Sequence, residues 1–298
     1  MTFLILKHVD CEGLGLWEEY CQEEGVALEI VELHRGGAPS PDGRFHAVVS
    51  LGGPMNVYEE EAHPFLRSED AFIRQALCQS VPFLGICLGG RLLAKAVGGR
   101  VTRNPVKEIG WHAVELDQQG QRDPLFAGLP DRFTVLQWHG DTFSLPSGAI
   151  RLASSQACEN QAFRFGFGGI AYALQFHLEV TPSMIGQWAH EYAGELAEGV
   201  ETAEAARMLE QAPARCEQLY PLSRRVFQNF CRLVQLRYAG VGCAPIGRQR
   251  EAERQPPTRD AAVERAWQRY RELMARGRLR CGVTCPLDRI GHCTGGCW

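Results

Sequence analysis

The sequence has no long apolar run, no excess of positive charge and very little lysine. Its 298 residues carry 31 basic and 35 acidic side chains, a formal net charge of −4, which gives no argument for nucleic-acid binding by the chain as a whole. No run of 18 apolar residues is present, so no membrane span is predicted. The apolar start, residues 1–8, is too short for a signal peptide and is typical of a first strand. Almost all basic residues are arginine, which we interpret as compositional bias rather than chemistry.

Cysteine, in contrast, is abundant. Eight of the twelve cysteines fall in the first 243 residues without the spacing of a disulfide framework. That distribution is typical of a protein in a reducing cytoplasm, which is where we expect this chain to act. The other four cluster in the last 18 residues: Cys281, Cys285, Cys293 and Cys297.

Short apolar runs alternate with helical patterns in the first third of the chain. Strands are expected at residues 3–6, 27–33, 47–51 and 81–86, and helices at 14–24, 65–80 and 88–97. This alternation predicts an α/β fold with a doubly wound, mostly parallel central sheet. Residues 101–174 carry shorter apolar segments between turn residues and are expected to be β-rich. Helices are expected again at 184–196 and 213–238.

A change in composition marks the end of the main domain. Glycine, proline, arginine and glutamine accumulate over residues 239–257. We therefore predict a main domain at 1–237, a linker at 238–257, and a short helical, Cys-rich appendage at 258–298.

Cys87 stands between glycines at a predicted strand-to-helix turn. Gly85 and Gly89 flank it where side chains would collide with the backbone. This pattern is typical of a nucleophile elbow with cysteine in the place of serine, and a helix N-terminus favours the thiolate. A buried structural cysteine in a tight turn is the alternative from this stretch alone.

A thiolate nucleophile needs a base and a group that orients the base. His177 and Glu179 stand two residues apart at the end of an apolar run, so both side chains are expected on one face. The loop Gly52-Gly53-Pro54 follows another predicted strand and is suited to aim a backbone N–H into a pocket.

Together the three motifs Leu51–Met55, Gly85–Gly89 and Gln175–Glu179 resemble those of the class I (triad) glutamine amidotransferases, and most closely the amidotransferase domain of GMP synthases and its stand-alone relatives. The resemblance covers residues 1–237. It implies that Cys87 is the nucleophile, His177 the base and Glu179 its orienting partner. It also implies an oxyanion hole formed by the backbone N–H groups of Gly53 and Leu88, and no cofactor for this chemistry.

Two positions depart from the family pattern. Leu178 replaces the usual proline between histidine and glutamate, which leaves the alternation unchanged. Arg91 replaces the usual glutamine four residues after the nucleophile. A guanidinium pairs with carboxylates rather than matching an amide, so Arg91 is a candidate substrate-binding residue with a preference for an additional carboxylate. The alternative is that Arg91 points to solvent.

The resemblance implies hydrolysis of the γ-amide of glutamine through a cysteine thioester. No ATP-binding or pyrophosphatase loop is present, so ammonia would pass to a separate synthase. Two alternatives stay open: a stand-alone γ-glutamyl peptide hydrolase, and a metal- or redox-responsive binding protein on an amidotransferase scaffold.

The four C-terminal cysteines are separated by three, seven and three residues, among turn formers. Four thiolates on a turn-rich segment are suited to hold zinc or an iron–sulfur cluster. Free or redox-switching thiols are the next interpretation, and structural disulfides the last.

Overall fold

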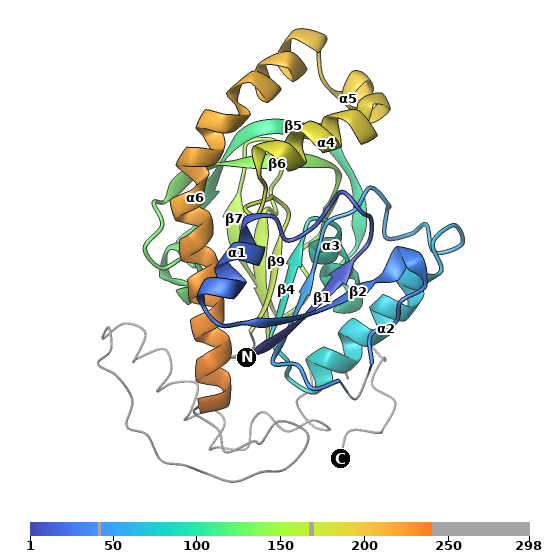
Figure 1. Cartoon of the computed structure of the whole chain (residues 1–298), viewed down its shortest axis with the longest axis vertical. Coiled ribbons are helices and arrows are strands. Elements are labelled where there is room, and N and C mark those ends of the chain that lie inside the picture. Colours follow the sequence, from blue (N-terminus) through green and yellow to red (C-terminus); the bar gives the residue numbers. More distant parts are fainter. Residues whose placement is uncertain (41–42, 167–169, 240–298) are drawn as a thin grey trace.

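A nine-stranded sheet of order β2-β1-β3-β4-β9-β8-β7-β5-β6 runs through the molecule (Figure 1). The computed structural model describes residues 1–40, 43–166 and 170–239. Residues 240–298, which include almost all of the predicted linker and all of the Cys-rich tail, lie outside them. The strands are β1 Thr2–Lys7, β2 Ala27–Glu32, β3 Ala47–Ser50, β4 Phe83–Ile86, β5 Val101–Leu116, β6 Arg132–Phe143, β7 Ala149–Ser154, β8 Ala162–Phe165 and β9 Ala171–Leu174.

The sheet is mixed, which corrects the prediction of a mostly parallel sheet. Strands β2, β1, β3, β4 and β9 pair in parallel, as the alternation of strands and helices predicted. Strands β9, β8, β7, β5 and β6 pair antiparallel and form the expected β-rich segment. Antiparallel neighbours need only short turns between them, so this half requires no crossover helices within it.

Helices cover both faces of the parallel half. They are α1 Leu16–Glu23, α2 Phe65–Cys78, α3 Leu88–Ala96, α4 Pro182–Glu191, α5 Ala193–Gly199 and α6 Thr202–Ala239, with 3₁₀ turns at Leu33–Arg35, Gly120–Arg122 and Pro124–Phe126. Within the described ranges, none of these helices is both long and apolar enough to cross a membrane.

Alternation along β1 divides the core into two clusters. Phe3 packs with α6, its ring 5.8 Å from that of Phe230 in an edge-on arrangement. Leu4 belongs to the second cluster, which contains Leu92 and other residues of α2 and α3. In Figure 1, α6 accordingly runs along one side of the sheet and α2 along the other.

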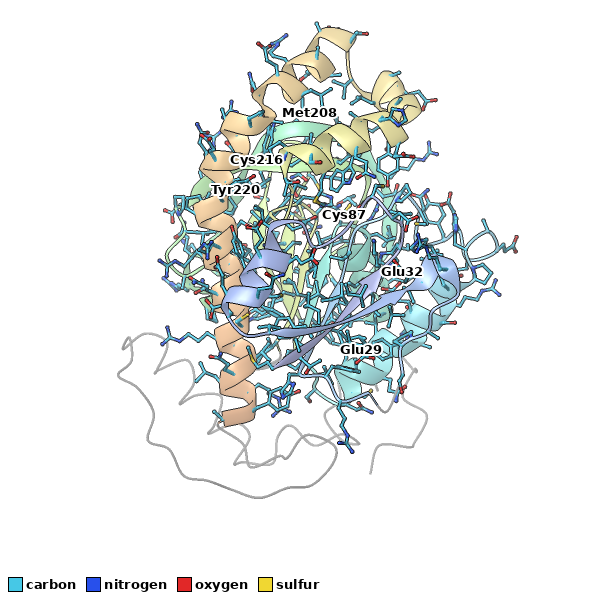
Figure 2. All side chains as sticks on the ribbon, in the orientation of Figure 1. Glu29, Glu32, Cys87, Met208, Cys216 and Tyr220 are labelled. Atoms are coloured by element: carbon cyan, nitrogen blue, oxygen red, sulfur yellow. The ribbon has the colours of Figure 1, made fainter. Side chains whose placement is uncertain are left out.

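Two helix predictions are wrong in their boundaries. The helix expected to begin at Pro213 begins at Thr202 and contains Pro213 and Pro221. The buried side chains Met208 and Ala212 continue the apolar face of the helix ahead of Pro213. Met208, Cys216 and Tyr220 mark the course of this helix in Figure 2. The single helix expected at 184–196 is two helices that meet at Tyr192.

The carboxyl ends of the parallel strands meet at one edge of the sheet. His8 follows β1, Leu51 follows β3, Cys87 follows β4 and Gln175 follows β9. Ligands of open α/β sheets bind at this edge.

Candidate active site

Cys87 lies in the turn between β4 and α3 with φ 49° and ψ −102°, a left-handed conformation that non-glycine residues rarely adopt. A Cβ on Gly85 would lie 2.4 Å from the Gly89 carbonyl oxygen, and a Cβ on Gly89 would lie 2.2 Å from the Ser50 carbonyl oxygen. Only glycine fits at both positions, so the sharp strand-to-helix turn that the sequence predicted is present. Figure 2 shows Cys87 in the interior of the molecule, and its side chain is only 3% exposed.

The structure brings His177 and Glu179 to Cys87. His177 lies near enough to Cys87 for the sulfur to affect the pKa of the ring, and its Nδ1 lies 2.6 Å from Glu179 Oε1. Glu179 Oε2 accepts the backbone N–H of Leu178 at 2.9 Å, which fixes the carboxylate. Burial alone would lower the pKa of His177, but the neighbouring Glu179 carboxylate and Cys87 side chain outweigh burial and raise that pKa well above its usual value.

His177 and Glu179 do not lie in a strand as expected. Strand β9 ends at Leu174, and His177 is held instead by an isolated bridge to β6, its N–H donating to the Leu136 carbonyl at 2.9 Å. The Trp188 ring of α4 packs edge-on against the imidazole, with centroids 4.8 Å apart. The orientation that the alternation predicted is therefore produced by β6 and α4.

The predicted oxyanion donors lie beside one another. The position of a Cβ on Gly53 is 2.8 Å from Leu88 Cδ2, and Gly53 lines the same cavity as Cys87. Leu88 is the first residue of α3, so its N–H belongs to the first helical turn, whose N–H groups have no partner within the helix. Gly53 and the first turn of α3 are thus close together at this cavity, as the predicted pair of donors requires.

Arg91 points inward, not to solvent. Its side chain is 4% exposed and lines the cavity, and Nη2 lies 3.8 Å from Cys87 Sγ. Its Nε is buried without a hydrogen-bond partner in the described part of the chain. A buried guanidinium with an unused donor next to the sulfur is suited to bind an anionic or carbonyl group.

The cavity over Cys87 has a volume of about 590 Å³. Its basic side chains come from α3 and from β5 (Arg91, Arg103, Lys107), and its acidic side chains come mainly from the β1–α1 loop and from α5 (Glu12, Glu195, Glu198). The cavity is therefore polar and of mixed charge, which suits a zwitterionic ligand.

Glu12 is a member of the site that the sequence analysis missed. Its carboxylate is buried, accepts a hydrogen bond from the Tyr192 hydroxyl at 2.9 Å, and lines the cavity. Both Glu12 Oε2 and His177 Cε1 lie within 3.0 Å of the point that a Cβ on Gly52 would occupy. Burial raises the pKa of Glu12, although His177 and the bond from Tyr192 oppose that effect. Only its position after the first strand could have identified it, and acidic residues are common in such loops.

One buried cluster of metal-ligand type occurs in the described part of the chain: Glu108, His139 and Cys158, with ligand atoms within 4.8 Å of one another. The Glu108 carboxylate, however, already accepts hydrogen bonds from Ser155, at 2.7 Å, and Gln161, at 2.7 Å, and lies 3.0 Å from His139 Nε2. This network occupies the carboxylate and supports the cavity wall at His139. The predicted metal ligands of the tail, Cys281, Cys285, Cys293 and Cys297, lie outside the described residues.

Comparison with known proteins agrees with this geometry. Residues 12–189 match the family described as glutamine amidotransferase class-I. A glutamine amidotransferase-like protein of Salmonella typhimurium, YfeJ, is 32% identical over 185 residues, which cover 61% of this chain and 77% of that protein. A GMP synthase of Thermosipho melanesiensis is 36% identical over 141 residues, which cover 47% of this chain but only 25% of the synthase.

Solved structures show the same fold. A glutamine amidotransferase of Thermotoga maritima superposes with a TM-score of 0.71 at 37% identity, covering 79% of this chain and 98% of that one. A glutamine amidotransferase of Methylobacillus flagellatus gives a TM-score of 0.70 at 26% identity, with coverage of 86% and 99%. The chain belongs to the class-I glutamine amidotransferase family.

Proposed function

We propose that this protein hydrolyses the γ-amide of glutamine through a thioester on Cys87. The observation that carries the proposal is the buried group of Cys87, His177 and Glu179 at a polar cavity, in which His177 Nδ1 lies 2.6 Å from Glu179 Oε1 and the pKa of His177 responds to both neighbours. A nucleophile, a base and a group that orients the base are the three parts that such a reaction needs.

The proposed steps follow from the positions of these groups. The Cys87 thiolate attacks the amide carbon, and the N–H groups of Gly53 and Leu88 stabilise the oxyanion. His177 gives its proton to the leaving nitrogen, the C–N bond breaks, and ammonia departs from the thioester. His177 then takes a proton from water, whose oxygen attacks the thioester carbon, and glutamate leaves as Cys87 is released.

The direct test is release of glutamate and ammonia from glutamine by the purified full chain. We expect turnover that Cys87→Ala and His177→Ala each reduce by several orders of magnitude, since both act on the reacting atoms. Mass spectrometry after rapid acid quenching should detect the glutamyl adduct on the wild type and not on Cys87→Ala. Full activity of folded Cys87→Ala would exclude the mechanism.

We further propose that the ammonia passes to a separate synthase. The GMP synthases matched here are much longer than the matched segment, which spans 25% of their length in the Thermosipho melanesiensis protein. No synthase motif is evident in this sequence, so the acceptor would be another chain. Stimulation of glutaminase activity by products of neighbouring genes would identify it.

A γ-glutamyl peptide hydrolase is the second candidate, and Arg91 favours it. The buried guanidinium beside Cys87 is better matched to a carboxylate than to a neutral amide. A γ-glutamyl dipeptide has such a carboxylate on its leaving group. Comparing kcat/KM for glutamine and for γ-glutamyl dipeptides distinguishes the two candidates.

For the C-terminal cysteines we propose what the sequence supports. They would form a zinc or iron–sulfur site, with the ligands Cys281, Cys285, Cys293 and Cys297. A cytoplasmic location is proposed with it, because a reducing compartment suits the buried free thiols Cys21, Cys216 and Cys231 of the folded domain.

A further inference from the structure

Three fully buried polar side chains lie directly beneath the Gly52–Gly53 loop: His8, Ser50 and Glu69. Glu69 belongs to α2, His8 follows β1, and Ser50 ends β3. Ser50 Oγ donates to Glu69 Oε1 at 2.7 Å, and His8 Nε2 lies 2.8 Å from Glu69 Oε2. The carboxylate thus joins the ends of two strands next to the loop.

The other nitrogen of His8 contacts the loop itself. His8 Nδ1 lies 2.9 Å from the carbonyl oxygen of Gly52. Carbonyl and carboxylate oxygens accept hydrogen bonds, so both ring nitrogens must donate, which requires the imidazolium form. Burial by itself would favour the neutral ring, but the charge of Glu69 and the bonds to Glu69 and Gly52 outweigh it and raise the pKa of His8.

The carbonyl of Gly52 and the N–H of Gly53 belong to the same peptide group. This peptide is trans, like all those of the described residues, so its C=O and N–H point in opposite directions. A hydrogen bond that holds the carbonyl toward His8 therefore holds the Gly53 N–H away from His8. With glycine on both sides, no side chain restricts the rotation of this peptide, although Pro54 limits the conformations of Gly53.

We propose that His8, held by Glu69, is a positioning residue that locks the Gly52–Gly53 peptide with the Gly53 N–H directed toward the oxyanion over Cys87. This inference rests on the proposed function, in which Gly53 supplies an oxyanion donor. Glu69 fixes the ring, the ring fixes the carbonyl, and the carbonyl fixes the N–H. His8 itself touches neither the substrate nor Cys87.

A matched pair of variants separates the two bonds of His8. The side-chain amide nitrogen of asparagine occupies about the place of Nδ1, and that of glutamine about the place of Nε2. His8→Asn therefore keeps the bond to Gly52, and His8→Gln keeps the bond to Glu69 and loses the one to Gly52. His8→Asn removes the bond to Glu69, which then keeps only the Ser50 hydroxyl, so any loss of stability falls on His8→Asn and not on His8→Gln, whereas His8→Ala would remove both bonds at once.

We expect His8→Gln to lower kcat for amide hydrolysis by up to about 10²-fold with little change in KM, because an oxyanion donor acts mainly in the transition state. His8→Asn should retain a clearly higher kcat than His8→Gln. Alkylation of Cys87 by iodoacetamide needs no oxyanion hole, so its rate should stay equal in both variants and the wild type. Equal kcat values for the two variants, or an equal loss of alkylation, would assign His8 a merely structural role.

Crystal structures of the two variants test the inference without any substrate. We expect the Gly52–Gly53 peptide to rotate in His8→Gln and to keep its orientation in His8→Asn. An unrotated peptide in His8→Gln would overturn the proposal. If the wild type hydrolysed neither glutamine nor γ-glutamyl peptides, the proposed function would fail, and the orientation of this peptide would still decide the role of His8.

Discussion

His177 Nδ1 lies 2.6 Å from Glu179 Oε1, in a pair that the protein buries almost completely. Because the pair raises the pKa of His177 above its usual value of 6.5, its stabilising contribution is fully present below pH 6.5. The contribution is lost as the pH rises through the raised pKa. The proton that His177 loses as the pH rises is also the proton that the proposed mechanism gives to the leaving nitrogen.

Replacing Glu179 by glutamine should therefore move the alkaline limb of the pH profile. Glu179→Gln removes the negative charge that raises the pKa of His177, so His177 loses its proton at lower pH and kcat/KM should fall at lower pH than in the wild type. We expect the loss of kcat to be roughly 10²-fold smaller than that of Cys87→Ala, as for the orienting residue of a comparable triad. An alkaline limb at the wild-type pH in an active variant would show that Glu179 does not control His177.

Gly89 is expected to tolerate no side chain. A Cβ there would lie 2.2 Å from the backbone oxygen of Ser50 in a central strand, which cannot move without disrupting the sheet. Gly89→Ala should destabilise the fold by about 3 kcal/mol or more and open the elbow. Thermal unfolding measures this effect.

Gly186→Ala is the matched control for Gly89→Ala. Gly186 lies within α4, and a Cβ there would meet nothing within 4 Å. Alanine should raise the stability by about 0.4–1 kcal/mol, because it lowers the conformational entropy of the unfolded chain. A Gly89→Ala protein that melts at the wild-type temperature with full activity would contradict the steric argument.

The sharp turn at Cys87 and the His177–Glu179 pair could be predicted because each depends on a short stretch of sequence. The turn around Cys87 needs Gly85 and Gly89 within two residues on each side, and His177 and Glu179 are separated by one residue. Local spacing carries this information without knowledge of the fold. Arg91 became a candidate through its place four residues after Cys87, where the family usually has glutamine, and the structure decides between the two alternatives by placing it in the cavity.

The supporting residues could not be predicted because distant segments bring them together. His8 acts on Gly52, 44 residues away, and neither has a local pattern that indicates the contact. The lengths of strands β5 and β6 were predicted too short for a related reason. Its residues Glu108, His139 and Asp141 are buried although they are polar, so the alternation of apolar and polar side chains that marks a strand is interrupted there.

Glu12 should reduce stability at neutral pH. Its carboxyl is buried and its pKa is raised above 4.5, so the folded state binds a proton more tightly than the unfolded state and stability falls as the pH rises from 4.5 through the raised pKa. Glu12→Gln removes the charge and keeps an oxygen for the Tyr192 hydroxyl. We expect the variant to be more stable than the wild type at pH 7 and equally stable below pH 4.5.

Chemical denaturation at the two pH values measures this difference. A Glu12→Gln protein less stable than the wild type at pH 7 would show that the ionised carboxylate makes a net favourable contribution, through His177 or His8. That result would contradict our conclusion that burial is the dominant effect on the pKa of Glu12.

The tail is expected to bind a metal through its four cysteines. We expect the full chain, purified without oxygen, to contain about one equivalent of zinc or one iron–sulfur cluster. A variant with Cys281→Ser and Cys285→Ser should lose it. Metal content far below one equivalent in the wild type, unchanged in the double variant, would leave these cysteines without a metal role.

Arg91 is expected to set the preference between substrates. Arg91→Gln removes a buried charged donor next to Cys87, so it should weaken hydrolysis of γ-glutamyl dipeptides relative to glutamine. A hydrogen bond to a charged group contributes about 1.5–3 kcal/mol, so the ratio of the two kcat/KM values should change by at least about tenfold. Arg91→Lys keeps the charge and loses the planar guanidinium, so its ratio of kcat/KM values should lie between those of the wild type and of Arg91→Gln. Arg132→Gln, at an exposed position of β6 outside the cavity lining, is the control and should leave the ratio nearly unchanged. An Arg91→Gln protein with the wild-type ratio would show that the guanidinium does not contact the part of the substrate that differs, and glutamine would then be the better candidate.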